Sequence, residues 1–144
     1  MKISTKGRYA VRAMLDLALQ SRDNPTLIKD ISERQQISCL YLEQLFTRLK
    51  AAGLVRSIRG PNGGFMLTRP PSEITFADIV RAMEGSTAPV DCVDNAHLCP
   101  RADTCISRRV WIELKDAMDR VLNTTTLEDL IDQEYWRELE KTHA

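Results

Sequence analysis

The chain has 144 residues with a net charge of zero, and 43% of its residues are apolar. This length suffices for one compact domain, or for a small domain with an appendage that needs a second copy to bury its apolar face. No apolar run is long enough to cross a bilayer and no secretory leader is recognisable, which argues against a membrane protein and predicts a cytoplasmic one.

Charge is divided between the two halves of the sequence. Residues 1–69 carry 12 Lys and Arg against 5 Asp and Glu, whereas residues 70–144 carry 8 against 15. The positive half attracts polyanions and the negative half repels them. We therefore expect the N-terminal half to meet nucleic acid.

Three helices are predicted first. One is capped by Ser4 or Thr5 and continues to about residue 21, and a short one spans about 27–35. After the turn QQIS, Ser38 is placed to cap a third helix over about 39–52. Its apolar residues recur at i, i+3, i+4 and i+7, which predicts a buried stripe of Leu42, Leu45, Phe46 and Leu49.

A hairpin follows in LVRSIRGPNGGFMLTRP, where two runs of strand-forming residues flank GPNGG. Asn62 and Gly63 are expected to supply the positive φ angles of a type I′ turn. Three helices and a hairpin are the order of a winged helix-turn-helix, so we predict a mainly α fold with a small β-hairpin wing. Residues 1–70 would form this DNA-binding unit.

Residues 71–144 are expected to hold a cysteine loop and dimerisation helices. Another amphipathic helix is predicted in ITFADIVRAMEG, and a long one over about 104–123, after the loop. The apolar stripe of the long helix spans roughly 160° of arc, too broad for one chain to cover. We therefore predict that it packs against the same helix of a second subunit in a homodimer. Thr126 and Asp129 should cap an acidic terminal helix.

The third helix offers side chains suited to reading double-stranded DNA in the major groove. Glu43 can accept a hydrogen bond from cytosine N4 and Gln44 can serve adenine. At the wing tip, Arg59 can enter a narrow minor groove. The candidate DNA-binding residues are Ser38, Tyr41, Glu43, Gln44 and Arg59, with Arg48 also outward. Weaker candidates for phosphate contact are Lys2, Lys6, Arg8, Arg12 and Arg56.

Three of the four cysteines, Cys92, Cys99 and Cys105, lie close together in DCVDNAHLCPRADTC. In a reducing compartment such thiols favour a metal or redox site over a disulfide framework. They suit an iron-sulfur cluster with a non-cysteine fourth ligand, or zinc bound together with His97, and the spacing does not decide between them. Cys39 is distant in sequence and is expected to be a small packing residue.

The sequence resembles the IscR-type iron-sulfur transcription regulators over about residues 1–130. The resemblance is carried by ISTKGRYAVRAMLDLAL, DISERQQIS, YLEQLFTRLKAAGLVRSIRGPNGGF and the three-cysteine loop. It implies a homodimer, promoter binding through the third helix and wing, and a cluster held by the three cysteines, with a 2Fe-2S cluster favoured over a 4Fe-4S cluster. The wider family includes NsrR-type nitric oxide sensors.

One position departs from this resemblance. IscR-type proteins usually have a histidine ligand three residues after the third cysteine, and this chain has Arg108 there. A guanidinium has no free lone pair for iron. The fourth ligand is left open among His97, Asp94, Asp103 and a group elsewhere in the dimer, while Arg108 can stabilise negative charge on the cluster.

These patterns predict a homodimeric transcription regulator, activator or repressor, whose promoter binding responds to an iron-sulfur cluster and so to cluster status, redox state or nitric oxide. The alternative is a zinc-stabilised DNA- or protein-binding adaptor with no sensing role. We do not expect an enzyme, because no C-x2-C motif or associated catalytic pattern is present.

Overall fold

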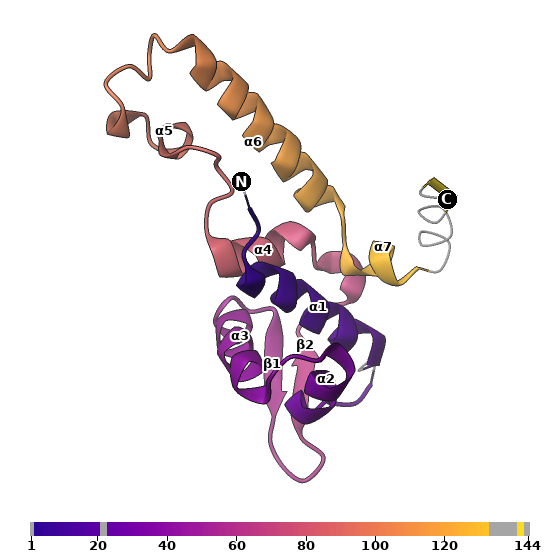
Figure 1. Ribbon diagram of the computed structural model, residues 1–144. Coiled ribbons are helices and arrows are strands. Elements are labelled where there is room, and N and C mark those ends of the chain that lie inside the picture. Colours follow the sequence, from indigo (N-terminus) through magenta and orange to yellow (C-terminus); the bar gives the residue numbers. More distant parts are fainter. Residues whose placement is uncertain (1, 21–22, 133–140, 143–144) are drawn as a thin grey trace.

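A computed structural model describes residues 2–20, 23–132 and 141–142 of the chain (Figure 1). Within them the fold is mainly helical with one two-stranded hairpin, which confirms the predicted winged helix-turn-helix class. The elements are α1 (Thr5–Gln20), α2 (Ile28–Gln35), α3 (Cys39–Ala51), β1 (Val55–Ile58), β2 (Gly64–Leu67), η1 (Pro71–Glu73), α4 (Phe76–Glu84), α5 (Asp91–Asp94), η2 (Ala96–Leu98), α6 (Ile106–Thr124) and α7 (Leu127–Ile131).

Helix α1 begins at the predicted cap. The Gly7 N–H donates to Ser4 Oγ at 3.3 Å, and Ser4 is itself held by Glu84 at the end of α4. The Glu84 carboxylate accepts from the Ser4 N–H at 2.8 Å and from the Ser4 hydroxyl. Gly7 permits this approach, since a Cβ there would lie 2.6 Å from Glu84 Oε1. The start of α1 is thereby fixed to the end of α4.

The stripe predicted for α3 faces the core. Its four apolar residues are each at most 1% exposed, and they pack with buried residues of α1. The preceding turn is formed by Gln36, which adopts the left-handed conformation at φ 57° and ψ 47°. Ser38 then caps α3 as predicted, because its Oγ accepts from the Tyr41 N–H at 3.2 Å.

An ion pair that the sequence did not predict joins α1 to α2. Asp16 is only 3% exposed, and its carboxylate accepts from Arg34 Nε at 3.0 Å and from Arg34 Nη2 at 2.8 Å. Gln35 Nε2 donates to the same carboxylate at 3.0 Å. A buried carboxylate requires such partners, because an unpaired charge in the interior is costly. These bonds fix the position of α2 on α1.

The wing forms with Val55 opposite Leu67 and Ile58 opposite Gly64. The predicted type I′ turn is wrong: Asn62 has no positive φ, and the connection has five residues, 59–63. The Gly63 N–H donates to the Gly60 carbonyl at 3.0 Å, which places Pro61 at the first central position of the turn. Proline fixes a negative φ there and so excludes type I′.

The base of the wing is attached to the segment before α2. Thr26 and Phe65 exchange two backbone hydrogen bonds, of 2.9 and 2.8 Å. Gly64 makes this possible, because a Cβ at that position would lie 2.5 Å from the Thr26 carbonyl oxygen. The orientation of the wing is therefore set by the helix-turn-helix itself.

Helices α4 and α7 complete the core. Thr75 and Thr126 each form the capping box, the latter with Asp129 as predicted. Ile74, Ile79 and Leu127 belong to the same buried cluster as α1 and α3. The core is thus continuous across residue 70, and the division into units 1–70 and 71–144 stays a prediction about function. Residues 133–140, to which the acidic terminal helix was expected to extend, lie outside the described part.

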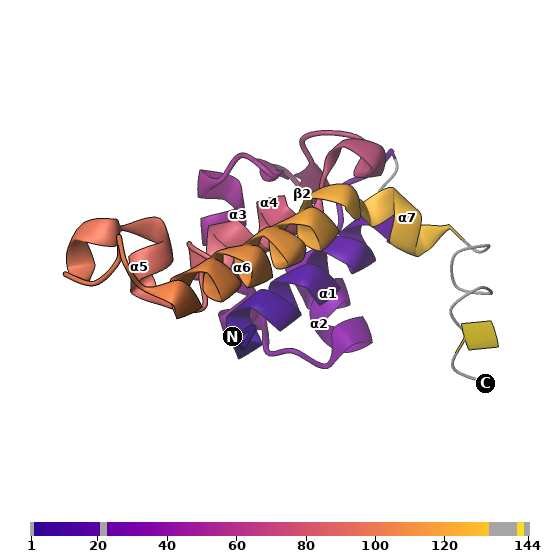
Figure 2. The same ribbon diagram turned by 90° about the horizontal axis from the view of Figure 1, so that it is seen from above.

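Helix α6 extends away from this body and carries α5 and η2 at its far end, as two views at right angles show (Figures 1 and 2). The wing tip lies at the opposite end of the molecule (Figure 1). The cysteine segment was predicted as a loop, and it contains the short helices α5 and η2 before α6 begins at Ile106. None of the described helices is long and apolar enough to span a membrane.

Candidate DNA-binding surface and cysteine loop

The exposed face of α3 is a second stripe with helical spacing, formed by Leu40, Glu43, Gln44 and Thr47. Glu43 and Gln44 are exposed, as predicted for base contacts. Tyr41 was predicted to face outward, but it is half-buried. Its ring packs edge-on against Tyr9 with the two ring centroids 5.8 Å apart. Ser38 is exposed and acts as the helix cap. The structure therefore places these candidates together at the N-terminal half of α3.

Leu40 is a residue that sequence reasoning missed. Its side chain is 68% exposed in the first turn of α3, on the same face as Glu43 and Gln44. The signal was available, because Leu40 is apolar but lies outside the buried stripe of α3. An exposed leucine in this position offers an apolar surface to a thymine methyl group.

Two basic residues of α3 already have partners in the protein. Arg48 Nη1 donates to the Met83 carbonyl of α4 at 3.4 Å, and Lys50 Nζ donates to Ser57 Oγ of β1 at 2.9 Å. Arg48 therefore connects α3 to α4, although it was expected to face DNA. Lys50 connects α3 to the wing.

Arg59 is exposed at the start of the wing turn, at the tip of the hairpin. Of the weaker phosphate candidates, Lys2, Arg8, Arg12 and Arg56 are exposed and Lys6 is half-buried. Arg12 is held in place, since its guanidinium donates to the Gln35 carbonyl and lies 5.2 Å from the centroid of the Tyr9 ring. Most of these basic side chains are thus exposed to solvent, from α1 to the wing.

The three clustered cysteines occupy three different local structures. Cys92 lies in α5, Cys99 follows η2, and Cys105 is the N-cap residue of α6. All three are half-buried free thiols. Cys39, expected to be a packing residue, is exposed at the start of α3.

Contacts at the start of α6 favour the thiolate of Cys105. The Ser107 hydroxyl, whose Oγ lies 3.2 Å from the sulfur, lowers the pKa of Cys105, with further contributions from the Arg108 backbone N–H and the charge of Arg101. Arg108 also contacts Cys92, because its Nε donates to the Cys92 carbonyl at 3.1 Å. One residue thus touches both the first and the third cysteine.

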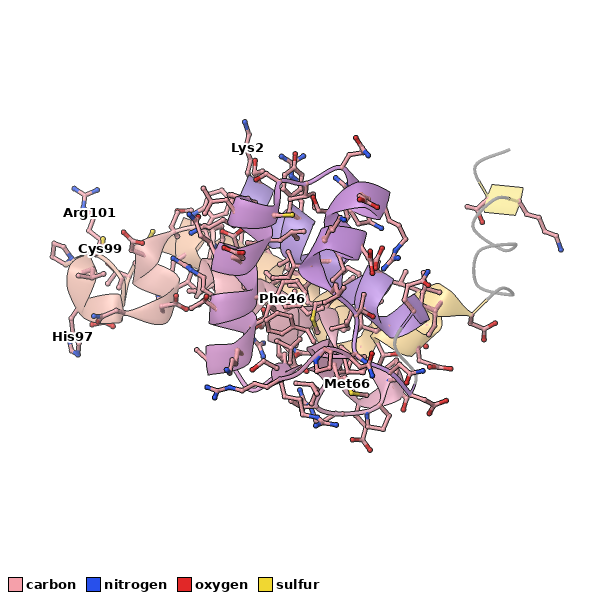
Figure 3. All side chains as sticks on the ribbon, turned by 90° about the horizontal axis from the view of Figure 1, so that it is seen from below. Lys2, Phe46, Met66, His97, Cys99 and Arg101 are labelled. Atoms are coloured by element: carbon pink, nitrogen blue, oxygen red, sulfur yellow. The ribbon has the colours of Figure 1, made fainter. Side chains whose placement is uncertain are left out.

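The open fourth-ligand candidates do not gather around these thiols. Figure 3 shows His97 and Cys99 projecting from opposite sides of the segment. Asp94 accepts a hydrogen bond from the Ser86 hydroxyl, and Asp103 is exposed. Among the described residues, no three His, Cys, Asp or Glu side chains are arranged to hold a metal ion.

The donor chemistry of this segment nevertheless fits a sulfur-ligated group. It supplies three free thiols within one short stretch, and one of them is favoured as thiolate, the form that binds metal. Among the described residues, these donors do not converge on one point. The segment therefore has the kinds of ligand atoms that such a group needs, but it does not have them already arranged around one point.

Helix α6 has no buried residue in its own chain. Its most exposed apolar side chains are Ile106 at 83%, Val121 at 63% and Val110 at 56%. On the side facing the body, Asp119 accepts from Thr87 Oγ1 at 2.8 Å and from Lys115, and lies 3.9 Å from Arg81 of α4. The Lys115 bond, followed by the Thr87 bond, lowers the pKa of Asp119.

Comparisons with known proteins cover nearly the whole chain. Residues 3–133 match the sequence profile of the Rrf2 family, described as "Iron-dependent Transcriptional regulator". The HTH-type transcriptional regulator IscR of Photorhabdus laumondii subsp. laumondii is 43% identical over 134 residues, which is 93% of this chain and 81% of that protein.

Solved structures agree with these sequence matches. CymR, the global cysteine regulator of B. subtilis, is 44% identical with a TM-score of 0.76, over 90% of this chain and 95% of that one. The IscR structure from T. potens is 40% identical with a TM-score of 0.74, over 91% of this chain and 86% of that one. These similarities confirm the resemblance found in the sequence.

Proposed function

This chain belongs to the Rrf2 family of transcriptional regulators, and on that premise we propose that it is a homodimeric, cytoplasmic regulator whose promoter binding is controlled by an iron-sulfur cluster. Regulation of transcription through DNA, and not catalysis, is the role that its relatives' names carry. The cluster, the dimer and the residue roles are the parts that we add.

The observation that carries the DNA-binding roles is the exposed stripe of α3. Glu43 and Gln44 lie on one face of a helix whose N-terminus is fixed by Ser38, and Leu40 lies beside them. We assign Glu43 and Gln44 to base edges in the major groove and Arg59 to the minor groove beside it. Tyr41 is assigned a supporting role, because its packing on Tyr9 directs the adjacent part of α3.

The apolar face of α6 supports the dimer. A 19-residue helix with no buried side chain leaves several large apolar residues in water, and burying one such side chain contributes about 1.5–3 kcal/mol. Two copies of α6 packed about a two-fold axis bury this face on both subunits at once. Introducing a charge with Val110→Asp should therefore yield monomers in sedimentation analysis, whereas Glu113→Asp on the same helix should remain dimeric.

Cys92, Cys99 and Cys105 would hold the cluster, which supplies a centre sensitive to oxidants and nitric oxide when bound. The positive charge of Arg101 lies near Cys105 and contributes to lowering its pKa, which favours a thiolate ligand. On this proposal, Arg108 is not the fourth ligand, because arginine cannot donate a lone pair to iron.

A continuous set of contacts connects the cysteine segment to the DNA-binding face. Asp119 of α6 is paired with Arg81 of α4, and the Met83 carbonyl of α4 is bonded by Arg48 of α3. We propose that ordering of residues 91–105 changes the position of α6, and through α4 the spacing of the two recognition helices. The signal then equals the difference in DNA affinity between the two arrangements.

Anaerobic purification with iron, sulfide and zinc analysis tests the cluster. We expect a coloured protein containing iron and sulfide, with loss of both in Cys92→Ser and retention in Cys39→Ser, the matched control. A colourless protein that contains zinc alone would support the adaptor function and overturn the sensor. Binding to selected promoter DNA, measured against salt with and without the cluster, tests regulation; equal affinity and equal sequence preference in both states would contradict it.

A further inference from the structure

Arg108, in the first turn of α6, connects to the other end of the cysteine segment through its side chain. Its Nε donates to the Cys92 carbonyl across 16 residues of chain, at 3.1 Å, and the side chain is partly buried. Its backbone lies in the first turn of α6, directly after the N-cap residue Cys105. Both ends of the cysteine segment are therefore connected through this one residue.

Besides this connection, α5 is held by the hydrogen bond that Asp94 accepts from the Ser86 hydroxyl. Helix α5 is a single turn, its described residues include none that is buried, and its N-cap residue has no side-chain cap hydrogen bond. A helix this short is unstable alone in water. Of the two side-chain hydrogen bonds to α5, the guanidinium bond from the first turn of α6 is the one that ends on Cys92 itself.

We propose that Arg108 is a positioning residue that holds Cys92 at the start of α6, so that the first and third thiols are already arranged when a sulfur-ligated cluster binds. The inference rests on the proposed function for its cluster, but the hydrogen bond itself is a feature of the structure. Ordering two of three ligands beforehand reduces the entropy lost on binding. Only the Cys99 part of the segment then has to close.

Arg109 provides a matched control. It has the same charge and lies in the same turn of α6, but it is exposed and its side chain is not bonded to α5. Arg108→Gln and Arg109→Gln remove one charge each, so the difference between them reports the Cys92 contact. Both positions lie outside the buried core, so the winged-helix unit should unfold at the same temperature in both variants.

Hydrogen exchange of the metal-free protein tests the contact directly. The N–H groups of Val93 in α5 and of Asn95, its C-cap residue, donate to the Val90 and Asp91 carbonyls, at 3.2 and 3.0 Å. We expect several-fold faster exchange over residues 91–95 in Arg108→Gln and an unchanged rate in Arg109→Gln. Arg108→Lys, which keeps the charge but not the Nε geometry, should recover only part of the protection. Equal exchange in both Gln variants, or full recovery with Lys, would overturn the hydrogen-bonded role.

Cluster loss to an iron chelator, followed by visible absorption, tests the consequence. Loss should be several-fold faster in Arg108→Gln than in Arg109→Gln, with the same starting spectrum, because no ligand has been removed. A changed spectrum would make Arg108 part of the coordination and overturn the positioning role, as would equal loss rates. If the wild-type protein takes up no iron and sulfide, the proposed function fails, while the exchange measurement still decides whether Arg108 holds Cys92.

Discussion

Replacing Gly64 by alanine should release the wing from the helix-turn-helix. The new Cβ would lie 2.5 Å from the Thr26 carbonyl oxygen and 2.7 Å from its carbon, and both are backbone atoms that cannot rotate away. Relief requires the loss of the two Thr26–Phe65 hydrogen bonds, each of which contributes about 0.5–1.5 kcal/mol net. Strain at φ +148° adds about 1–3 kcal/mol.

Gly60→Ala is the matched control, because Gly60 also has a positive φ, +109°, but a Cβ there meets nothing within 4 Å. The strain is common to both variants, so Gly64→Ala should be less stable than Gly60→Ala by about 1–3 kcal/mol. Urea unfolding measures this difference. At urea concentrations below the unfolding midpoint, where the protein is still folded, Gly64→Ala should bind DNA more weakly. The reason is that Arg59 loses its fixed position relative to α3. Equal unfolding free energies for the two variants would refute the role given to the Thr26 contact.

Three further predictions concern other parts of the chain. Asp16→Ala should cost about 2 kcal/mol of unfolding free energy in urea, less than for a fully buried pair because Arg34 is 37% exposed; a cost within 0.5 kcal/mol would contradict the ion pair's role. Exchanging thymine for deoxyuridine in a selected promoter site should weaken binding roughly fourfold at one position, about 0.8 kcal/mol for a methyl group, and Leu40→Ala should remove that difference; a difference that persists in Leu40→Ala would exclude the contact. Because the folded-state pKa of Asp119 is lowered, its contribution to stability is present above its unfolded pKa and is lost as pH falls through the folded value. The stability advantage over Asp119→Asn in thermal unfolding should therefore be constant above about pH 4, the ordinary pKa of an aspartate, and decline as pH falls below it; an advantage independent of pH would contradict the role assigned to its charge.

Much of the fold was predictable because it depends on local periodicity and capping chemistry. The stripe of α3, the Ser38 cap and the capping box at Thr126 are each determined within a few residues of chain. The turn of the wing was predicted wrongly, since Asn-Gly was given more weight than the proline before it. Pro61 fixes a negative φ at the first central position, and this local rule was available in the sequence.

The contacts that could not be predicted join residues distant in the chain. Asp16 with Arg34, Thr26 with Phe65, and Ser4 with Glu84 depend on how helices pack, and periodicity contains no information on such pairs. For the cysteine segment, sequence identified the donors and the departure at position 108. It could not show that Arg108 bonds to the Cys92 carbonyl, because that contact depends on the path of the chain between α5 and α6.

The cysteine segment and the wing tip lie at opposite ends of the molecule (Figure 1). When α3 and Arg59 bind promoter DNA, the DNA therefore does not cover the cysteine segment, and small diffusing reagents can still reach its thiols. Under the proposed function, the stimulus can react with the protein while it is bound to DNA, and the protein does not have to dissociate from the DNA first. How quickly a gene responds is then governed by the departure rate of the altered protein from DNA, a quantity that single-molecule residence times record.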